Sequence, residues 1–188
     1  HNLDWSVEGV EASNQETLGG LQRGFIVAVF GIFVVLAGIF RSYAQPFLIV
    51  AIVPFGIIGA FLGHGALGIP VTLISLFGIV ALTGVVVNDN IVLLECINGL
   101  LARGEPFYEA LCQGGVRRFR AIFLTTVSTV IGLLPVISET NLQAQMVIPM
   151  AVSIAAGVLC ATVITLLFMP ALLAILNDGR RVALYALT

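Results

Sequence analysis

An acidic side chain flanked by two amides interrupts one of the most apolar stretches of the sequence. Asn88, Asp89 and Asn90 lie within the otherwise apolar segment 84–94. A carboxylate inside an apolar span costs from about 2.5 kcal/mol upward, so burial favours the neutral, protonated form. Such a group can load and release protons, and the amides can hydrogen-bond to either form. The alternative interpretation is a structural polar contact that holds helices together.

A second set of polar or small residues has helical spacing. Thr125, Ser128, Thr129 and Gly132 stand at positions i, i+3, i+4 and i+7, which places them on one face of a helix. This face could pack closely on the helix that carries Asp89 and present hydroxyls that relay protons or hold water. Ordinary packing of Ser, Thr and Gly between helices is the equal alternative.

The remaining polar residues favour structural interpretations. Arg118 and Arg120 are most simply anchors at the inner membrane interface, although either could pair with a carboxylate of a relay. Glu95 is expected to be a solvated anchor, and His64 a solvated residue of an outer turn. The short segment 105–115, with an early Pro and a final Gly-Gly pair, predicts a connector helix lying on the membrane surface.

Small residues indicate where helices approach each other. Gly59 and Gly63 form a small-xxx-small pair, which permits close packing between helices. The three cysteines match no metal-site spacing and are expected to be small core residues without a disulfide; no metal site is predicted.

The composition defines the class of protein that must position these residues. Of 188 residues, 59 % are hydrophobic and only 10 % charged, with a net charge of −2. So few charges exclude a soluble enzyme, the high hydrophobicity excludes disorder, and the lack of a basic stripe argues against nucleic-acid binding. An integral membrane protein in contact with lipid remains.

Charge-free blocks and turn residues predict an all-α integral membrane protein with a five-helix transmembrane bundle. A spanning helix needs about 20 apolar residues, and the charge-free block 42–88 is divided by a cluster of Gly and Pro at 63–70. The predicted bundle covers 21–177, with a leading segment 1–20, a loop 101–118 and a tail 178–188. Its helices are expected at about 21–40, 46–62, 71–100, 119–137 and 145–176.

Arginine counting predicts the orientation. Seven of the eight basic residues, all Arg, fall in the 41 turn, the 101–120 region and the tail, all on one side of the membrane. The positive-inside rule then places the leading segment, which carries Asp4, Glu8, Glu11 and Glu16, in the periplasm and the C-terminus in the cytoplasm. An outside N-terminus that starts without Met or a signal peptide leads us to expect a fragment of a larger transporter.

Five ordered stretches resemble the C-terminal membrane half of RND (resistance-nodulation-division) efflux permeases of the acriflavin-resistance type. They are PFGIIGA at 54–60, SLFGIVALTGVVVND at 75–89, RFRAIFLTT at 118–126, GLLP at 132–135 and QAQMVIPMA at 143–151. They occur in the family's order and spacing, from about Trp5 to Leu176.

The resemblance implies a twelve-helix, pseudo-symmetric transporter of the inner membrane, of which this chain would be helices eight to twelve. It implies a missing N-terminal half, large periplasmic domains, and a homotrimer that works with a periplasmic adaptor and an outer-membrane channel. It also implies a proton antiporter for amphiphilic compounds, driven by the proton-motive force without a cofactor. The chain itself is expected to perform no bond chemistry. It holds no nucleotide-binding loop of the GxxxxGK(S/T) type, so ATP is not expected as its energy source.

By the same resemblance, the family's relay joins carboxylates on the absent half to polar residues on the tenth and eleventh helices. Multidrug members place a Lys where this sequence has Asn88. The sequence therefore lacks that positive charge, and the next residue, Asp89, carries a carboxylate. The family's eleventh-helix Arg and Thr align with Arg118 and Thr125. The predicted relay is therefore Asp89, Asn88, Asn90, Thr125 and Arg118.

The sequence leaves three alternatives to multidrug export. A heavy-metal exporter would require methionine pairs along a path, and the sequence offers Met146, Met150 and Met169. A lipid- or sterol-carrying relative would share the bundle. A non-transporting membrane remnant would not need Asp89.

Overall fold

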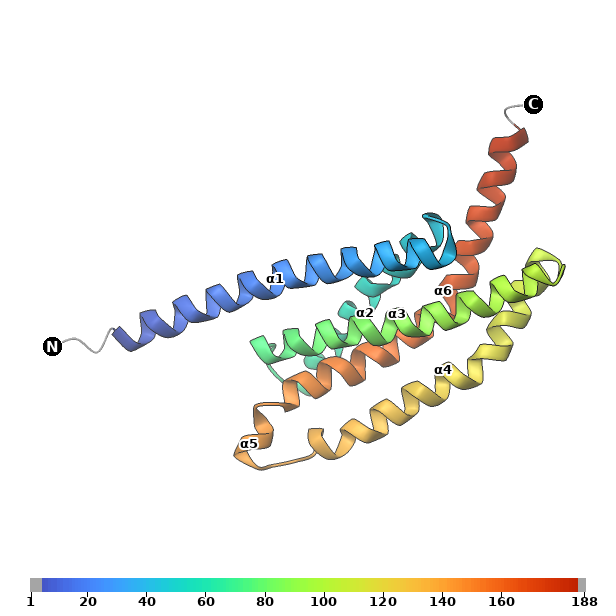
Figure 1. Cartoon of the computed structure of the whole chain (residues 1–188). Helices are drawn as coiled ribbons and strands as arrows, with labels where there is room; N and C mark the ends of the chain where they lie inside the picture. The colour runs from blue at the N-terminus through green and yellow to red at the C-terminus, as the bar shows by residue number, and fades with distance from the viewer. Residues whose placement is uncertain (1–4, 186–188) are drawn as a thin grey trace. The chain divides into compact units, whose positions relative to one another are not determined.

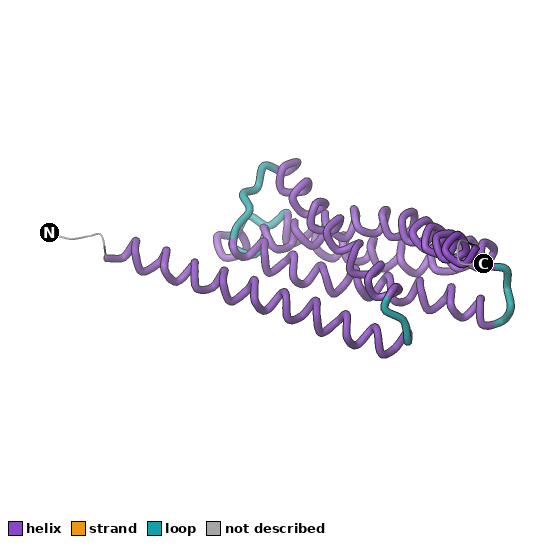
Figure 2. The backbone as a smooth tube through the Cα atoms, turned by 90° about the horizontal axis from the view of Figure 1, so that it is seen from above, coloured by secondary structure: helices purple, strands orange, loops and turns teal. Residues whose placement is uncertain are grey.

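The chain folds into α-helices joined by short connections. The structure, a computed structural model, describes residues 5–185, except for the side chains of residues 5–11, 142 and 179–185. Figure 1 shows the described helices in chain order and Figure 2 their short connections. They are α1 (Trp5–Phe40), α2 (Ala44–Leu67), α3 (Leu73–Ala102), α4 (Phe107–Ile137), α5 (Leu142–Gln145) and α6 (Ile148–Tyr185).

Five of the described helices, all except the short α5, are long and apolar enough to cross a membrane. This confirms the predicted all-α architecture of five apolar helices. Two compact units divide the chain, residues 1–50 and residues 51–188. The first holds α1 and the start of α2. Apolar side chains cover the exposed faces of its α1, as expected for a helix surrounded by lipid or by other protein, and include Ile26, Val27, Phe30, Val34 and Val35.

Local sequence explains where α3 begins and where the chain turns into α4. Thr72 caps α3 by a capping box: its Oγ1 accepts from the Ser75 amide at 3.3 Å, and its own amide donates to the Ser75 hydroxyl at 3.0 Å. After α3, Gly104 adopts φ +87°, a left-handed conformation that costs glycine little. Pro106 then precedes the first turn of α4.

The second unit is a bundle in which α3, α4 and α6 pack against one another in pairs. Most of its largest fully buried side chains are aliphatic and come from α2, α3, α4 and α6, among them Ile52, Leu82, Leu93, Ile97, Ile122, Val158 and Met169. α3 supplies many of them and carries buried residues along most of its length, so any polar group on its inner side lies away from solvent.

Glycines let three helices approach closely around the first half of α6. A Cβ added to Gly59 or Gly63 of α2 would overlap Cys160 or Ala156 of α6. A Cβ added to Gly78 of α3 would lie 2.7 Å from the Met150 carbonyl oxygen. The predicted small-xxx-small pair thus faces α6, and a third glycine brings α3 against the same helix.

The prediction of a separate connector helix over 105–115 is wrong. Residues from Phe107 onward belong to α4, which continues without a break to Ile137. Gly114 lies so close to α3 that an added Cβ would meet Ile97 Cγ1 at 2.5 Å, and Ala110 and Leu111 are buried beside it. Packing against α3 therefore outweighs the low helix propensity of the Gly-Gly pair.

Other helix ends also differ from the predicted bounds. α1 starts at Trp5 instead of about 21, so the helix includes much of the predicted leading segment 1–20. α2 continues to Leu67 through the glycines that were expected to end it near 62, and α6 continues to Tyr185 instead of 176. The acidic residues Asp4, Glu8 and Glu11 and the tail arginines Arg180 and Arg181 lie outside the described residues or among the undescribed side chains.

Candidate functional site

Helix periodicity separates the three consecutive polar residues at the middle of α3. Asp89 is 7 % exposed and Asn90 is fully buried, whereas Asn88 is exposed. Successive helical residues point about 100° apart, so three in a row cannot share one face. Of the predicted group, Asp89 and Asn90 line the inner side of α3 and Asn88 does not.

Asn90 links α3 to α6 and leaves one atom unpaired. Its Nδ2 donates to the Val86 carbonyl at 2.7 Å and to the Thr165 hydroxyl at 3.2 Å, and Thr165 is itself buried. Its Oδ1 is buried and has no hydrogen-bond partner among the described residues. A buried acceptor without a donor costs about 1–3 kcal/mol. Asn90 Oδ1 can therefore accept a hydrogen bond from one further donor, such as a water molecule or a protonated acid.

Asp89 is the acid of this site. Among the side chains that the structure describes, none forms a hydrogen bond or an ion pair with its carboxyl group. Burying an unpaired carboxylate is unfavourable, and protonation removes that cost. Gain or loss of a proton at Asp89 would therefore change the free energy of packing α3 against its neighbours.

A second hydroxyl contact joins α4 to α6 beside the first. The hydroxyls of Thr126 and Thr162 lie 2.6 Å apart, and both residues are buried. Thr162 and Thr165 stand at i and i+3 on α6, so they share a face. We call five of the buried polar residues on α3, α4 and α6 the polar core: Asp89, Asn90, Thr126, Thr162 and Thr165.

Sequence reasoning missed Thr126, Thr162 and Thr165. The available signal was the i, i+3 pair of threonines within the apolar run of α6, but hydroxyls in apolar helices commonly bond to their own backbone and carry no unique meaning. Only the packing of α3 and α4 on α6 gives these three residues partners in other helices.

The predicted polar face of α4 lies elsewhere. Thr125 and Ser128 are exposed, and the hydroxyls of Thr125 and Thr129 donate to the carbonyls one turn earlier, at 2.9 Å from Ala121 and 2.8 Å from Thr125. A Cβ added to Gly132 would meet no described atom within 4 Å. The buried face of α4 is instead the one that carries Ile122 and Thr126, about 100° around the helix.

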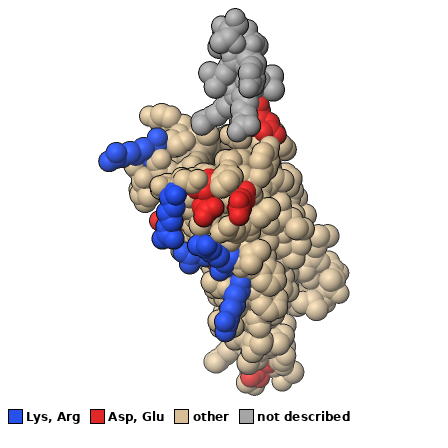
Figure 3. All heavy atoms as spheres, turned by 90° about the vertical axis from the view of Figure 1, so that its right-hand side faces the viewer, with Lys and Arg blue, Asp and Glu red and all other residues tan. Residues whose placement is uncertain are grey.

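Arg118 is half-buried at the start of the apolar part of α4, in a region where charges gather. Its neighbour Arg117 donates to Gln113 at 3.0 Å, and Gln113 donates to Glu109 at 3.2 Å. Figure 3 looks toward the end of the structure that includes the α3–α4 connection, where basic and acidic side chains lie among uncharged ones. Glu95, predicted as a solvated anchor, is exposed on α3.

His64 is not the solvated turn residue that the sequence predicted. It is only 4 % exposed, because α2 continues past it and carries the ring into a contact with α6. Its Nε2 lies 2.9 Å from the Ser153 hydroxyl and its Nδ1 lies 3.0 Å from the Ile69 carbonyl oxygen.

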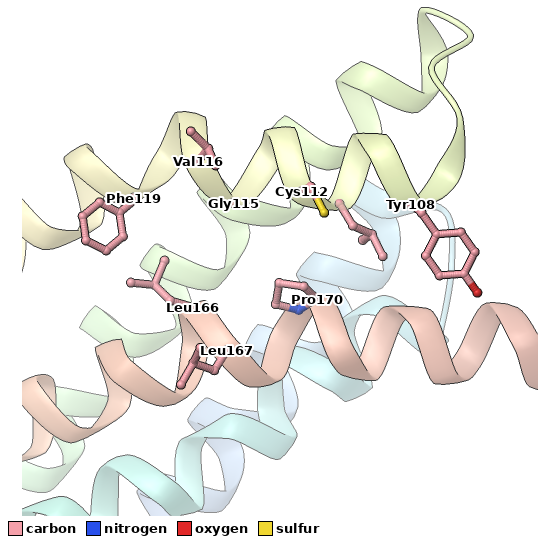
Figure 4. A pocket seen from close by; sticks show the side chains of 9 residues that line it. Tyr108, Cys112, Gly115, Val116, Phe119, Leu166, Leu167 and Pro170 are labelled. Atoms are coloured by element: carbon pink, nitrogen blue, oxygen red, sulfur yellow. The ribbon is translucent and has the colours of Figure 1, made fainter.

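An apolar groove of about 620 Å³ lies between the N-terminal part of α4 and α6 (Figure 4). No charged side chain lines it. Tyr108, one of the lining residues, donates from its hydroxyl to Asp178 at 2.8 Å. None of the polar-core residues lines the groove. Its lining residues are Tyr108, Leu111, Cys112, Gly115, Val116, Phe119, Leu166, Leu167 and Pro170.

The described part of the chain holds no cluster of metal-binding side chains. Residues whose side chains are placed include no group of three or more His, Cys, Asp or Glu suited to hold a metal ion. Cys96, Cys112 and Cys160 are free thiols.

An all-helical, multi-pass membrane protein with a polar core at its helix packing is the class that this geometry defines. The model of the AcrB/AcrD/AcrF family matches residues 2–177. The chain belongs to this family of RND efflux transporters.

The relatives include proteins named for multidrug resistance and for metal resistance. The chain is 27 % identical to "Multidrug resistance protein MdtC" of Erwinia amylovora over 94 % of its length, and 30 % identical to "Cobalt-zinc-cadmium resistance protein CzcA" of Cupriavidus metallidurans over 78 %. A crystal structure of a heavy metal efflux pump is similar over 81 % of this chain, with a TM-score of 0.72 and 28 % identity. The matched regions are 17 % of MdtC, 14 % of CzcA and 15 % of the solved chain, so this chain spans a small part of each.

Proposed function

We propose that the chain forms the C-terminal membrane part of a proton-driven efflux pump and that Asp89 is its proton-binding acid. The observation that carries this proposal is that Asp89 is only 7 % exposed within an apolar helix and directly precedes Asn90, whose buried Oδ1 has no hydrogen-bond partner among the described residues. Membership of an efflux transporter family supplies the activity to which such an acid would be coupled.

The proposed mechanism is alternating protonation. When Asp89 is charged, its burial between apolar helices is unfavourable, and α3 is driven toward an arrangement that gives the carboxylate water or a positive partner. When Asp89 is protonated, the neutral acid fits the closed packing of the apolar helices. Because Asn90, the next residue of α3, bonds to Thr165 of α6, a movement of α3 at this position would act on α6. A carboxyl group on the other half of the pump would take part in the same relay.

The test is Asp89→Asn, which keeps the shape of the side chain and removes its titration. We expect proton-coupled efflux by the protein, as produced in its own membrane, to fall to background at unchanged expression. Asn88→Ala is the matched control, because Asn88 is the exposed neighbour in the same helical turn. Normal efflux in this variant would show that the effect belongs to Asp89 and not to any change among the three polar residues 88–90. Normal resistance and normal proton uptake in Asp89→Asn would contradict the proposal.

The substrate proposed first is an amphiphilic compound, in line with the resemblance to multidrug permeases and the similarity to MdtC. The comparisons with CzcA and with the solved heavy metal pump favour metal ions as the second candidate. Of the three methionines that could mark a metal path, Met169 is buried and Met146 is exposed. Resistance assays with detergent-like compounds and with Zn²⁺, Co²⁺ and Cd²⁺ salts distinguish the two classes.

The rest of the assembly is also proposed by analogy with the family. The leading segment would face the periplasm and the C-terminus the cytoplasm of a Gram-negative inner membrane. The working unit would be a homotrimer of twelve-helix subunits with periplasmic domains, an adaptor protein and an outer-membrane channel.

A further inference from the structure

His64 is a buried titratable group that the polar core does not use. It lies near the C-terminal end of α2, and its two ring nitrogens face two different elements. Nδ1 lies 3.0 Å from the carbonyl oxygen of Ile69, in the connection to α3, and Nε2 lies 2.9 Å from the hydroxyl of Ser153, in α6. The Ile69 amide also donates to the His64 carbonyl at 3.1 Å, which fixes the connection on the end of α2.

The partners determine the form of the ring. A carbonyl oxygen only accepts, so Nδ1 must carry the proton and donate to Ile69. In the neutral ring Nε2 is then an acceptor, and the Ser153 hydroxyl donates to it. The neutral Nδ1-protonated ring therefore satisfies both contacts, whereas a charged ring would turn Nε2 into a donor and force the serine proton elsewhere.

The ring sits where three helices are in close contact. One residue before it, Gly63 lies against Ala156 of α6, and Gly78 of α3 lies against Ser153 with an added Cβ 3.0 Å from the serine Cβ. Ser153 is fully buried. A change in the His64–Ser153 contact would therefore act on the packing of α2, α3 and α6 together.

The described surroundings provide no negative charge for a protonated ring. On α2, on 68–72 and on residues 148–178 of α6, the part of that helix whose side chains are described, the other titratable residues are Cys160 and Asp178, 7 and 25 residues beyond Ser153. On α3 the titratable residues are Asp89, Glu95 and Cys96. The nearest of these to Gly78, Asp89, is 11 residues away, about 16 Å along the helix at 1.5 Å per residue. A buried charge without a counter-charge is unfavourable, so protonation works against the closed contact.

We propose that His64 is a second proton-binding site of this transporter, distinct from Asp89, and that its protonation loosens the contact between α2 and α6. In the neutral form the ring fastens α2 and the 68–72 connection to Ser153. In the charged form it is more stable in water, and the population shifts toward an arrangement that exposes it. The inference depends on the His64 geometry and not on Asp89 being the coupling acid.

Native cysteines offer a direct test. Cys160 lies against Gly59 at the α2–α6 contact, whereas Cys112 is exposed on α4. The protein in its membrane is treated briefly with the permeant reagent N-ethylmaleimide, and labelling of each cysteine is measured by peptide mass spectrometry. The ratio of Cys160 to Cys112 labelling corrects for the general effect of pH on thiols. We expect this ratio to rise about threefold or more from pH 8.0 to pH 5.5.

Three variants test whether His64 causes the rise in the Cys160 to Cys112 labelling ratio. His64→Gln should remove the rise, and Ser153→Ala should raise the ratio already at pH 8.0. Asp89→Asn should keep the rise, so failure of the proposed coupling acid and failure of this inference are distinguishable. A constant ratio in the unmodified protein, or the same rise in His64→Gln, would overturn the inference.

A spectroscopic measurement keeps the test decisive if His64→Gln does not accumulate. In protein labelled with ¹⁵N-histidine, the signal assigned to His64 by its change in Ser153→Ala should show the Nδ1-protonated neutral ring at pH 8.0. It should convert to the doubly protonated form on acidification while the Cys160 ratio rises. An Nε2-protonated ring, or a ring that never titrates between pH 8.0 and 5.5, would reject the proposed site.

Discussion

At the scale of single residues, the polar core consists of groups whose partners lie on other helices. Asn90 bonds to Thr165, and Thr126 bonds to Thr162. In an apolar bundle such contacts are worth about 0.6 kcal/mol on average and up to about 1.7 kcal/mol, since the unfolded reference state in the membrane also finds partners. These energies are small, so the contacts can be remade when a proton moves.

The Thr126–Thr162 contact can be measured by a double-mutant cycle. Thr126→Val and Thr162→Val each leave one buried hydroxyl without its partner, so each should destabilise the folded protein by about 1 kcal/mol. Because the double variant removes both hydroxyls, it should cost less than the sum, with a coupling energy of about 0.5–1.7 kcal/mol. Reversible unfolding in mixed micelles gives these values.

Thr125→Val is the control for that cycle. Thr125 stands next to Thr126, but it is exposed and bonds only to its own helix at Ala121. Its substitution should change stability by less than about 0.5 kcal/mol. Strict additivity of the Thr126 and Thr162 variants would show that the two hydroxyls do not interact.

At the scale of elements, the bundle depends on glycines that remove the space between helices. Gly63 of α2 contacts Ala156 of α6, and Gly78 of α3 contacts Met150 and Ser153 of the same helix. Dispersion between closely spaced backbones replaces the hydrophobic driving force that is missing in lipid. This arrangement also explains why α2 continues through the glycines near 63–65, because packing stabilises a helix that propensity alone would end.

A reciprocal exchange of side-chain volume tests the α2–α6 contact. Gly63→Ala inserts a methyl group that overlaps Ala156, so it should destabilise the protein by about 1–3 kcal/mol. Adding Ala156→Gly removes the opposing methyl group and should recover most of the loss. The thermal transition of the purified protein in detergent reports both changes.

Gly65→Ala is the matched control for that exchange. It lies in the same helix two residues on, and an added Cβ meets no described atom within 4 Å. It should not lower the transition temperature. Equal effects of Gly63→Ala and Gly65→Ala would show that helix propensity matters at these positions and the contact does not.

At the scale of the whole molecule, the five apolar helices define a multi-pass membrane protein whose arginines predict its orientation. Arg103 lies in the α3–α4 connection, and Thr140 lies in the connection after α4, on the opposite side of the membrane if α4 crosses it. The positive-inside rule therefore predicts that the Arg103 side faces the cytoplasm.

Cysteine labelling checks this orientation. In a variant with Cys112→Ser, we expect Thr140→Cys to react with a membrane-impermeant maleimide in intact spheroplasts, because it should face the periplasm. Arg103→Cys should react only in inverted membrane vesicles. The reverse pattern would contradict the orientation and with it the assignment of the leading segment to the periplasm.

The sequence alone was sufficient for the class, the number of long apolar helices and the burial of Asp89, because hydrophobicity and the position of a residue within an apolar run are properties of residue type and run length. It could not decide which faces of α4 and α6 are buried, because Thr125 and Thr126 are chemically alike and only packing separates them. The same holds for His64, which is polar by type and became buried through the continuation of α2 and its contact with Ser153. Partners on distant segments arise from tertiary packing, and one-dimensional periodicity carries no record of them.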